Sequence, residues 1–238
     1  MRHLARSKDD PHVISKAMLA MVPETFLAKV PPDRVTELLE AGRELKVPAG
    51  RLLPRKPKAP GVVIVVVGLV RVFLQSSRQR QVTVRYARPG ETLGLVHLAG
   101  AKLDVHAQAV TAATLWALSP RRLRALAEQS PPLAMAIAEE CAARTADAVE
   151  EIALLTFGSV RQRVARHLLD LAATDAHGEQ LVARVTHQEV ADATGSVREV
   201  VARVLKALNA SALTRQSTDG IIIVDAAGLD AEARGFTH

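Results

Sequence analysis

The spacing of hydrophobic residues changes twice along the 238-residue chain. Between Thr25 and Leu45 the apolar residues recur at helical intervals, which Pro31-Pro32 interrupts. Residues 46–118 instead hold short β-rich runs separated by glycine and proline, as in 61–68 and 82–86. From Ser119 onward the spacing is helical again. This order predicts an N-terminal antiparallel barrel or roll followed by a helical region.

A long helix is predicted to begin at Pro131-Pro132 and to run to about Thr156. Steps of four and three residues along it define a heptad seam of mostly small side chains. Small residues allow two helices to approach closely, so we interpret the seam as a dimer interface; packing of the helix on its own domain is the alternative. The predicted seam residues are Ala134, Ala138, Cys141, Thr145, Ala148, Ile152 and Leu155.

The residues after this helix predict a winged helix-turn-helix. Phe157-Gly158-Ser159 interrupts the helical pattern and is a candidate hinge. A helix over 160–171 and a strand over 181–185 come next, and two short helices follow them. Asp219-Gly220 then marks a hairpin turn before the apolar strand 221–225.

The two short helices carry clear capping signals. Thr186 is a predicted N-cap, and Glu189, three residues later, completes a capping box. Gly195 stands where the chain must turn, and Ser196 is the predicted cap of the second helix. The core face of that helix is predicted to comprise Val197, Val200, Val201, Val204, Leu205 and Leu208.

Charged residues near the start of the second helix indicate base recognition. Arg198, Glu199 and Arg203 lie off the apolar face, where a recognition helix meets the major groove. Arginine can bind guanine through two hydrogen bonds, and glutamate can accept one from cytosine. The alternative is an ordinary helical hairpin with solvated charges. The candidate DNA-binding residues are Thr186, His187, Gln188, Ser196, Arg198, Glu199, Arg203 and Lys206.

Composition narrows the possible functions. The formal net charge is +6, and residues 41–90 hold eleven Lys or Arg and one acid. That charge fits an anionic partner but does not identify one; double-stranded DNA is expected as the partner from the placement of the charged residues on the second helix. One cysteine, Cys141, excludes an internal disulfide or a Cys₄ metal site, and the eight histidines form no pair at ligand spacing. No catalytic motif or membrane-length apolar run occurs. We therefore expect a cytoplasmic protein that is not an enzyme, with no metal and no cofactor.

The order of elements resembles the Crp/Fnr family of bacterial transcription regulators. The resemblance implies an α+β fold: an N-terminal β-roll sensor-like domain (1–130), a dimerisation helix and hinge (131–158) and a winged helix-turn-helix (159–238). It also implies a homodimer on a palindromic site with RNA polymerase as a partner, and Arg198, Glu199 and Arg203 reading a TGTGA-like half-site. Val197 and Val200 depart from the family, which often has Ser or Thr there to contact DNA phosphate.

The sensor half departs further from the family's cyclic-nucleotide pocket. Leu95 stands near the place of the glutamate that binds the ribose, and Leu103-Asp104 near the Arg-Ser pair that binds the cyclic phosphate. The family's Thr-Ser adenine contacts fall at Ala148 and Val149. An aspartate in place of an arginine repels a phosphate, so we expect that cyclic AMP does not bind in the usual manner.

Other signals remain open. The basic cluster Arg51, Arg55, Lys56 and Lys58 could bind a cyclic dinucleotide, although charge runs are usually solvated. His97 or His106 could ligate a haem that senses a gas, and Cys141 could respond to oxidation, although packing roles are more common for such residues. A further alternative is a ligand-binding β-roll protein whose C-terminal domain mediates only protein contacts.

Overall fold

The computed structural model describes residues 14–54, 61–75, 81–100, 105–174 and 180–234. They form two compact units that are each discontinuous in sequence. The first contains the described residues up to Val70 together with Ala87–Ala143, and the second contains Arg71–Tyr86 together with the described residues from Arg144 onward. The predicted α+β fold, with N-terminal antiparallel sheets and C-terminal helix-turn-helix helices, is confirmed.

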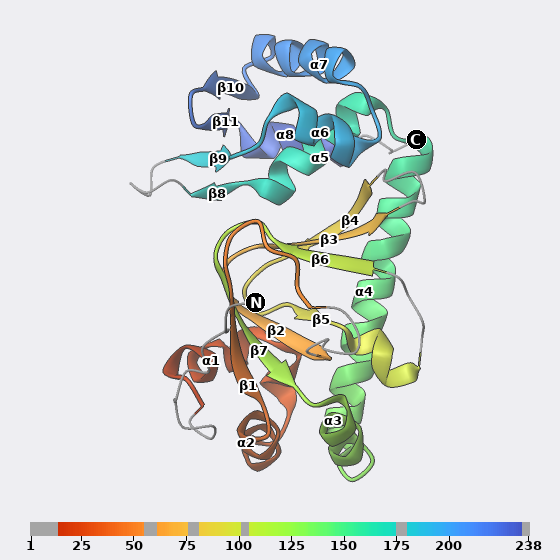
Figure 1. The fold of residues 1–238 in the computed structure, drawn as a ribbon. Helices are drawn as coiled ribbons and strands as arrows, with labels where there is room; N and C mark the ends of the chain where they lie inside the picture. The colour runs from red at the N-terminus through yellow and green to blue at the C-terminus, as the bar shows by residue number, and fades with distance from the viewer. Residues whose placement is uncertain (1–13, 55–60, 76–80, 101–104, 175–179, 235–238) are drawn as a thin grey trace, which may run out of the picture. The chain divides into compact units, whose positions relative to one another are not determined.

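Antiparallel strands form the centre of the first unit (Figure 1). Its main sheet has the order β1-β7-β2-β5, and Ile64 of β2 pairs with Trp116 of β7. Valine-rich β2 is buried along five of its six residues, as expected for a strand with apolar groups on both sides. The strands of this unit are β1 (Arg43–Val47), β2 (Val62–Val67), β5 (Thr92–Leu93), β6 (Val105–Ala109) and β7 (Ala113–Leu118).

Short helices flank these strands. Pro32 occupies the first turn of α2, and Ser119 caps α3, whose first residue is Pro120. The prediction placed helical residues as far as Leu45, but that residue lies in β1. The helices are α1 (Lys16–Met21), α2 (Pro32–Glu40), α3 (Pro120–Ala127) and the 3-10 helices η1 (Val22–Glu24), η2 (Phe26–Lys29) and η3 (Leu95–Ala99).

The long helix α4 covers Pro131–Phe157, which confirms the predicted element. It ends directly before Gly158, and Ser159 then starts a new helix through a capping box with Gln162. The predicted interruption is therefore present at Gly158-Ser159, whereas Phe157, which the prediction included, is the last residue of α4. Hinge motion there remains a prediction.

The second unit contains the hairpin of β3 and β4 and all elements that follow α4. Helices α5 and α8 pack together, and four short strands form a sheet of order β10-β11-β9-β8 beside them (Figure 1). The elements are β3 (Val70–Gln75), β4 (Gln81–Ala87), α5 (Val160–Leu171), β8 (Ala173–Thr174), β9 (Leu181–Ala183), α6 (His187–Thr194), α7 (Arg198–Ala210), β10 (Thr214–Ser217), β11 (Gly220–Ile223) and α8 (Ala226–Arg234).

Candidate nucleic-acid interface

The first helix of the helix-turn-helix, α6, is fixed by the predicted capping box. The Glu189 amide donates to the Thr186 hydroxyl oxygen at 3.2 Å, and the Glu189 carboxylate accepts from the Thr186 amide at 2.7 Å. These bonds satisfy two backbone donors that a helix start leaves free. Val190 and Ala191 are fully buried, so the apolar side of α6 faces the core of the unit.

The turn between the helices depends on Gly195. Its φ of 65° and ψ of 33° place it in the left-handed region, which costs a residue with a Cβ roughly 1–2 kcal/mol of conformational free energy. The preceding carbonyl, that of Thr194, accepts a hydrogen bond from Arg163 Nε at 3.0 Å. The same guanidinium also donates to the Gly158 carbonyl at 2.6 Å, so one side chain of α5 holds both the turn and the end of α4.

The start of the second helix, α7, differs from the prediction. Its N-cap is Val197, which makes no side-chain capping bond, so the predicted capping by Ser196 is wrong. Ser196 is half-buried in the turn, and its amide donates to the Ala191 carbonyl at 2.9 Å. The assignment of Val197 to the core face is also wrong, because its side chain is 57% exposed.

The remainder of α7 divides into a buried and an exposed face. Val201, Leu205 and Leu208 are buried, as predicted, while Val200 and Val204 are only half-buried. The charged candidates point away from the core and are exposed: Arg198, Glu199, Arg203 and Lys206. Because these side chains are exposed, their charges are accessible to a ligand.

The predicted hairpin forms a wing beside these helices. β10 and β11 pair in antiparallel register, with Ser217 opposite Gly220. The Ser217 hydroxyl donates to the Gly220 carbonyl at 3.1 Å, which closes the turn. Gly220 has a φ of 138°, and a Cβ there would lie 2.5 Å from the Ala183 carbonyl oxygen. Glycine is therefore required for the wing to approach β9.

A cleft separates the wing from the start of α6 and brings several candidates together. Thr186, His187, Gln188 and Arg198 line it on the helical side, and Gln216 on the wing side. His187 Nε2 lies 3.5 Å from Gln216 Oε1, which connects the two sides. Glu199, Arg203 and Lys206 are outside this cleft; Lys206 lines a neighbouring hollow that His187 also reaches.

Two exposed arginines near this cleft were not among the sequence candidates. Arg184 follows β9 and lines the cleft, and Arg215 lies in β10, adjacent to Gln216. The polar run from Thr214 to Asp219, directly before the apolar strand 221–225, was a signal for an exposed wing strand. No pattern within the sequence placed Arg184 beside the recognition helix, because that contact depends on strand pairing.

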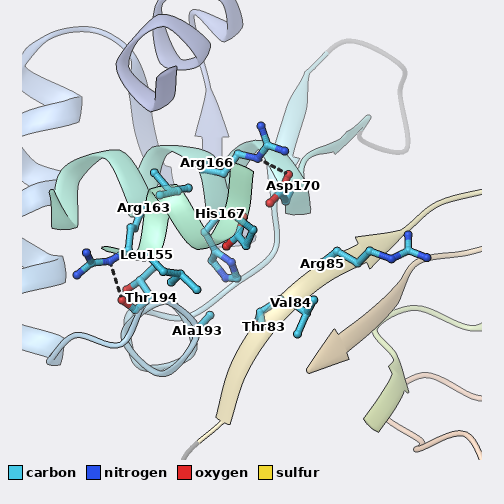
Figure 2. Close-up of a pocket in the computed structure, with 12 residues that line it drawn as sticks. Thr83, Val84, Arg85, Leu155, Arg163, Arg166, His167, Asp170, Ala193 and Thr194 are labelled. Atoms are coloured by element: carbon cyan, nitrogen blue, oxygen red, sulfur yellow. Dashed lines mark hydrogen bonds and ion pairs between the residues drawn. The ribbon is translucent and has the colours of Figure 1, made fainter. Parts of the chain in front are cut away.

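A second cavity lies within the same unit, between β4 and the helices (Figure 2). It measures about 20 Å³, enough for roughly one water molecule, so it is too small for an effector. Burial raises the pKa of Glu151 in its lining to about 7, and the charge of Asp170 adds to the rise while Arg166 opposes it. Arg166 and Asp170 form an ion pair of 3.3 Å.

Leu95, Ala148 and Val149 offer no polar side chain to a cyclic nucleotide. Leu95 is 7% exposed and belongs to an apolar core cluster, so no carboxylate reaches a ribose from that position. Ala148 is half-buried and Val149 is 60% exposed, and neither carries a hydroxyl. Leu103-Asp104 lies outside the described residues, as do Arg55, Lys56 and Lys58.

The other candidate signal residues lie in ordinary surroundings. His97 is half-buried in η3, and its Nδ1 has no hydrogen-bond partner among the described residues. His106 is half-buried in β6. Cys141 packs against the core of the first unit, and burial, with help from Glu140, raises the pKa of its thiol. A raised pKa lowers the thiolate fraction and so disfavours oxidation.

Neither a metal nor a membrane site appears in the parts that the structure covers. No group of three or more His, Cys, Asp or Glu side chains there could hold a metal ion. Among the same residues, no helix has the length and apolarity needed to cross a bilayer.

A capped first helix, a glycine turn, exposed charges on the second helix and an adjacent wing define a DNA-binding regulator. Comparisons with known proteins agree. Residues 162–232 match the Crp-like helix-turn-helix domain, and residues 44–130 match the cyclic nucleotide-binding domain. The chain belongs to the Crp/Fnr family of transcriptional regulators, and its relatives are regulators rather than enzymes.

Individual relatives show the extent of the similarity. Transcriptional regulator LdrP of Thermus thermophilus is 36% identical over 171 residues, which cover 70% of this chain and 84% of LdrP. The cAMP-activated global transcriptional regulator CRP of Salmonella typhimurium is 28% identical over 162 residues, which cover 66% of this chain and 77% of the CRP chain. A solved CRP/FNR-family regulator from Thermus thermophilus is 27% identical, with a TM-score of 0.65 over 80% of this chain and 98% of that one.

Proposed function

We propose that this regulator binds double-stranded DNA sequence-specifically as a homodimer on a palindromic, TGTGA-like site, and that it contacts RNA polymerase. The observation that carries the proposal is the exposure of Arg198, Glu199 and Arg203 on α7, opposite the buried face of that helix. Arginine recognises the O6 and N7 atoms of guanine, and glutamate accepts from the N4 amino group of cytosine. These edges belong to the guanine of a TG step and to the cytosine of the complementary CA step.

The cleft beside α6 supports a separate role in backbone binding. Thr186, His187 and Gln188 stand at the start of that helix, where polar side chains and amides suit a phosphate. Such contacts set register on the duplex and carry no sequence information. We therefore assign base reading to α7 and positioning to the α6 start and the wing.

The exposed surface of α4 supports the dimer. Its exposed residues include Met135, Ala138, Ala142, Thr145, Val149 and Ile152, which recur at alternating steps of three and four. Three residues of the predicted seam belong to this stripe: Ala138, Thr145 and Ile152. Cys141, Ala148 and Leu155 of that seam are half-buried within their own chain. A heptad stripe exposed along a 27-residue helix fits pairing with a second copy.

Control by cyclic AMP is not part of the proposal. The polar groups that such a ligand needs are replaced at Leu95, Ala148 and Val149, and the residues present do not fit the cyclic nucleotide in the family's manner. We propose a dimer that is either constitutively competent or controlled by another signal.

Substitution of the α7 arginines tests the proposal. DNA sites are selected from a random library, and binding is then followed by mobility shift at fixed salt. Arg198→Ala is expected to relax base preference and Arg203→Ala to weaken specific binding, each by roughly 1–3 kcal/mol, or about 5- to 150-fold. Arg121→Ala, an exposed arginine on α3, is the charge-matched control. Unchanged preference in both α7 variants would refute the assignment.

A further inference from the structure

Val197 stands at a helix N-cap, a position that favours a residue with a side-chain oxygen. It is the N-cap of the recognition helix and has no side-chain oxygen for the free amides there. Two other helices of this unit, α5 and α6, have Ser159 and Thr186 as N-caps, and each of these forms a complete capping box. An apolar N-cap costs about 1 kcal/mol relative to serine or threonine.

Burial does not compensate for the missing cap. The Val197 side chain is 57% exposed, and Val201, Leu205 and Leu208 already supply the buried face of α7. An exposed valine that neither packs nor caps departs from the local preference of the N-cap position. Departures from local preference are concentrated at functional sites.

The neighbours of Val197 indicate its ligand. Arg198 and Glu199 follow it directly and are exposed on the same first turn. The family often has a hydroxyl at this place that contacts DNA phosphate, and valine has none to offer. The first residues of a recognition helix also lie at the major groove, where the apolar group on a base edge is the 5-methyl of thymine.

We propose that Val197 contacts a thymine 5-methyl group and is a specificity-determining residue for the base beside those that Arg198 and Glu199 read. This inference rests on the proposed DNA-binding function. Contact with one methyl group is worth about as much as burial of one methylene, so it contributes about a fourfold difference in affinity.

Deoxyuridine provides the probe, because it differs from thymidine only by this methyl group. Each thymine of the selected site is replaced by deoxyuridine, symmetrically in both half-sites, and the Kd is measured by fluorescence anisotropy at fixed salt. The wild-type chain is expected to lose about fourfold in affinity per half-site at one thymine position. Val197→Ser, which restores a capping hydroxyl and so favours the helix, is expected to bind the thymine and uracil sites equally.

Val224→Ser is the matched control, because Val224 has the same 57% exposure but follows β11 outside α7. It is expected to keep the wild-type preference for thymine over uracil. The inference is overturned by a half-site without thymine, by a wild-type chain that tolerates uracil at every position, or by an unchanged thymine preference in Val197→Ser. If a preferred site exists, these results leave the proposed function standing; if no DNA sequence is preferred at all, the proposed function fails as well.

Discussion

At the scale of the residue, His167 is a titratable group enclosed by the second unit. It is 6% exposed, and its ring lies 5.6 Å from the ring of Tyr86 in the β4 strand. Burial, and then the positive charge of Arg71, lowers the pKa of His167 to about 4. Burial also raises the pKa of Tyr86 to about 12, so both rings are neutral at pH 7.

The lowered pKa of His167 predicts a loss of stability in mild acid. The unfolded chain, with a histidine pKa near 6.5, binds more protons than the native state between about pH 4 and 6.5. Stability is therefore full above that window and falls as the pH drops through it, by about 3 kcal/mol for this group. Urea unfolding at pH 7 and pH 4.5 measures the loss.

A neutral replacement isolates this effect from the titration of carboxylates. His167→Gln should lower stability at pH 7 through lost packing but should show a shallower decline toward pH 4.5. The half-buried His187, whose side chain faces the cleft, is the comparison site. If His167→Gln and His187→Gln declined in parallel with the wild type, His167 would not be the proton acceptor.

At the scale of the element, the sequence signals that predicted helices and turns correctly were local. The capping box of Thr186 with Glu189 and the helix-ending Gly195 predicted the bounds of α6, because caps depend on neighbours three residues away. The hairpin at Asp219-Gly220 was found for the same reason. Proline at 131 and 132 predicted the start of α4.

Other elements needed information from distant residues. The spacing of Val197 fits the periodic valines of α7, and periodicity does not tell whether a residue is the first helical position or the one before it. The two-residue strands β5 and β8 are too short to show alternation. The half-burial of Cys141 depends on the core of the first unit, which no spacing within α4 encodes.

The exposed stripe of α4 gives a prediction for this helix. Ile152→Asp places a carboxylate at 62% exposure on the proposed dimer face, where two copies would repel each other. We expect this variant to be largely monomeric by light scattering after size exclusion, and to lose affinity for the palindromic site.

A helix-matched control separates pairing from folding. Ala143→Asp adds the same charge at an exposed position on another face of α4, and it should remain dimeric. A wild-type monomer at micromolar concentration, or a dimer that Ile152→Asp leaves intact, would contradict the proposed seam.

At the scale of the whole molecule, the C-terminal half keeps the family's DNA-reading residues, whereas the N-terminal half lacks residues that bind the cyclic nucleotide in that family. The C-terminal unit presents the expected arginines and glutamate on α7, whereas the described part of the N-terminal unit has leucine at the place of a nucleotide-binding glutamate. This contrast predicts no saturable heat in isothermal titration of the full chain with cyclic AMP. Titration of the same sample with its selected DNA shows that the protein is active. Micromolar binding of cyclic AMP at one site per subunit would overturn this expectation.

The membership of Arg71–Tyr86 in the second unit has a consequence for how the chain is made. During synthesis these residues leave the ribosome before α5, which provides the His167 ring that Tyr86 meets. At bacterial elongation speeds the delay is on the order of ten seconds. In that interval the nascent hairpin lacks the α5 surface of its own unit, including the His167 ring that Tyr86 meets in the folded protein.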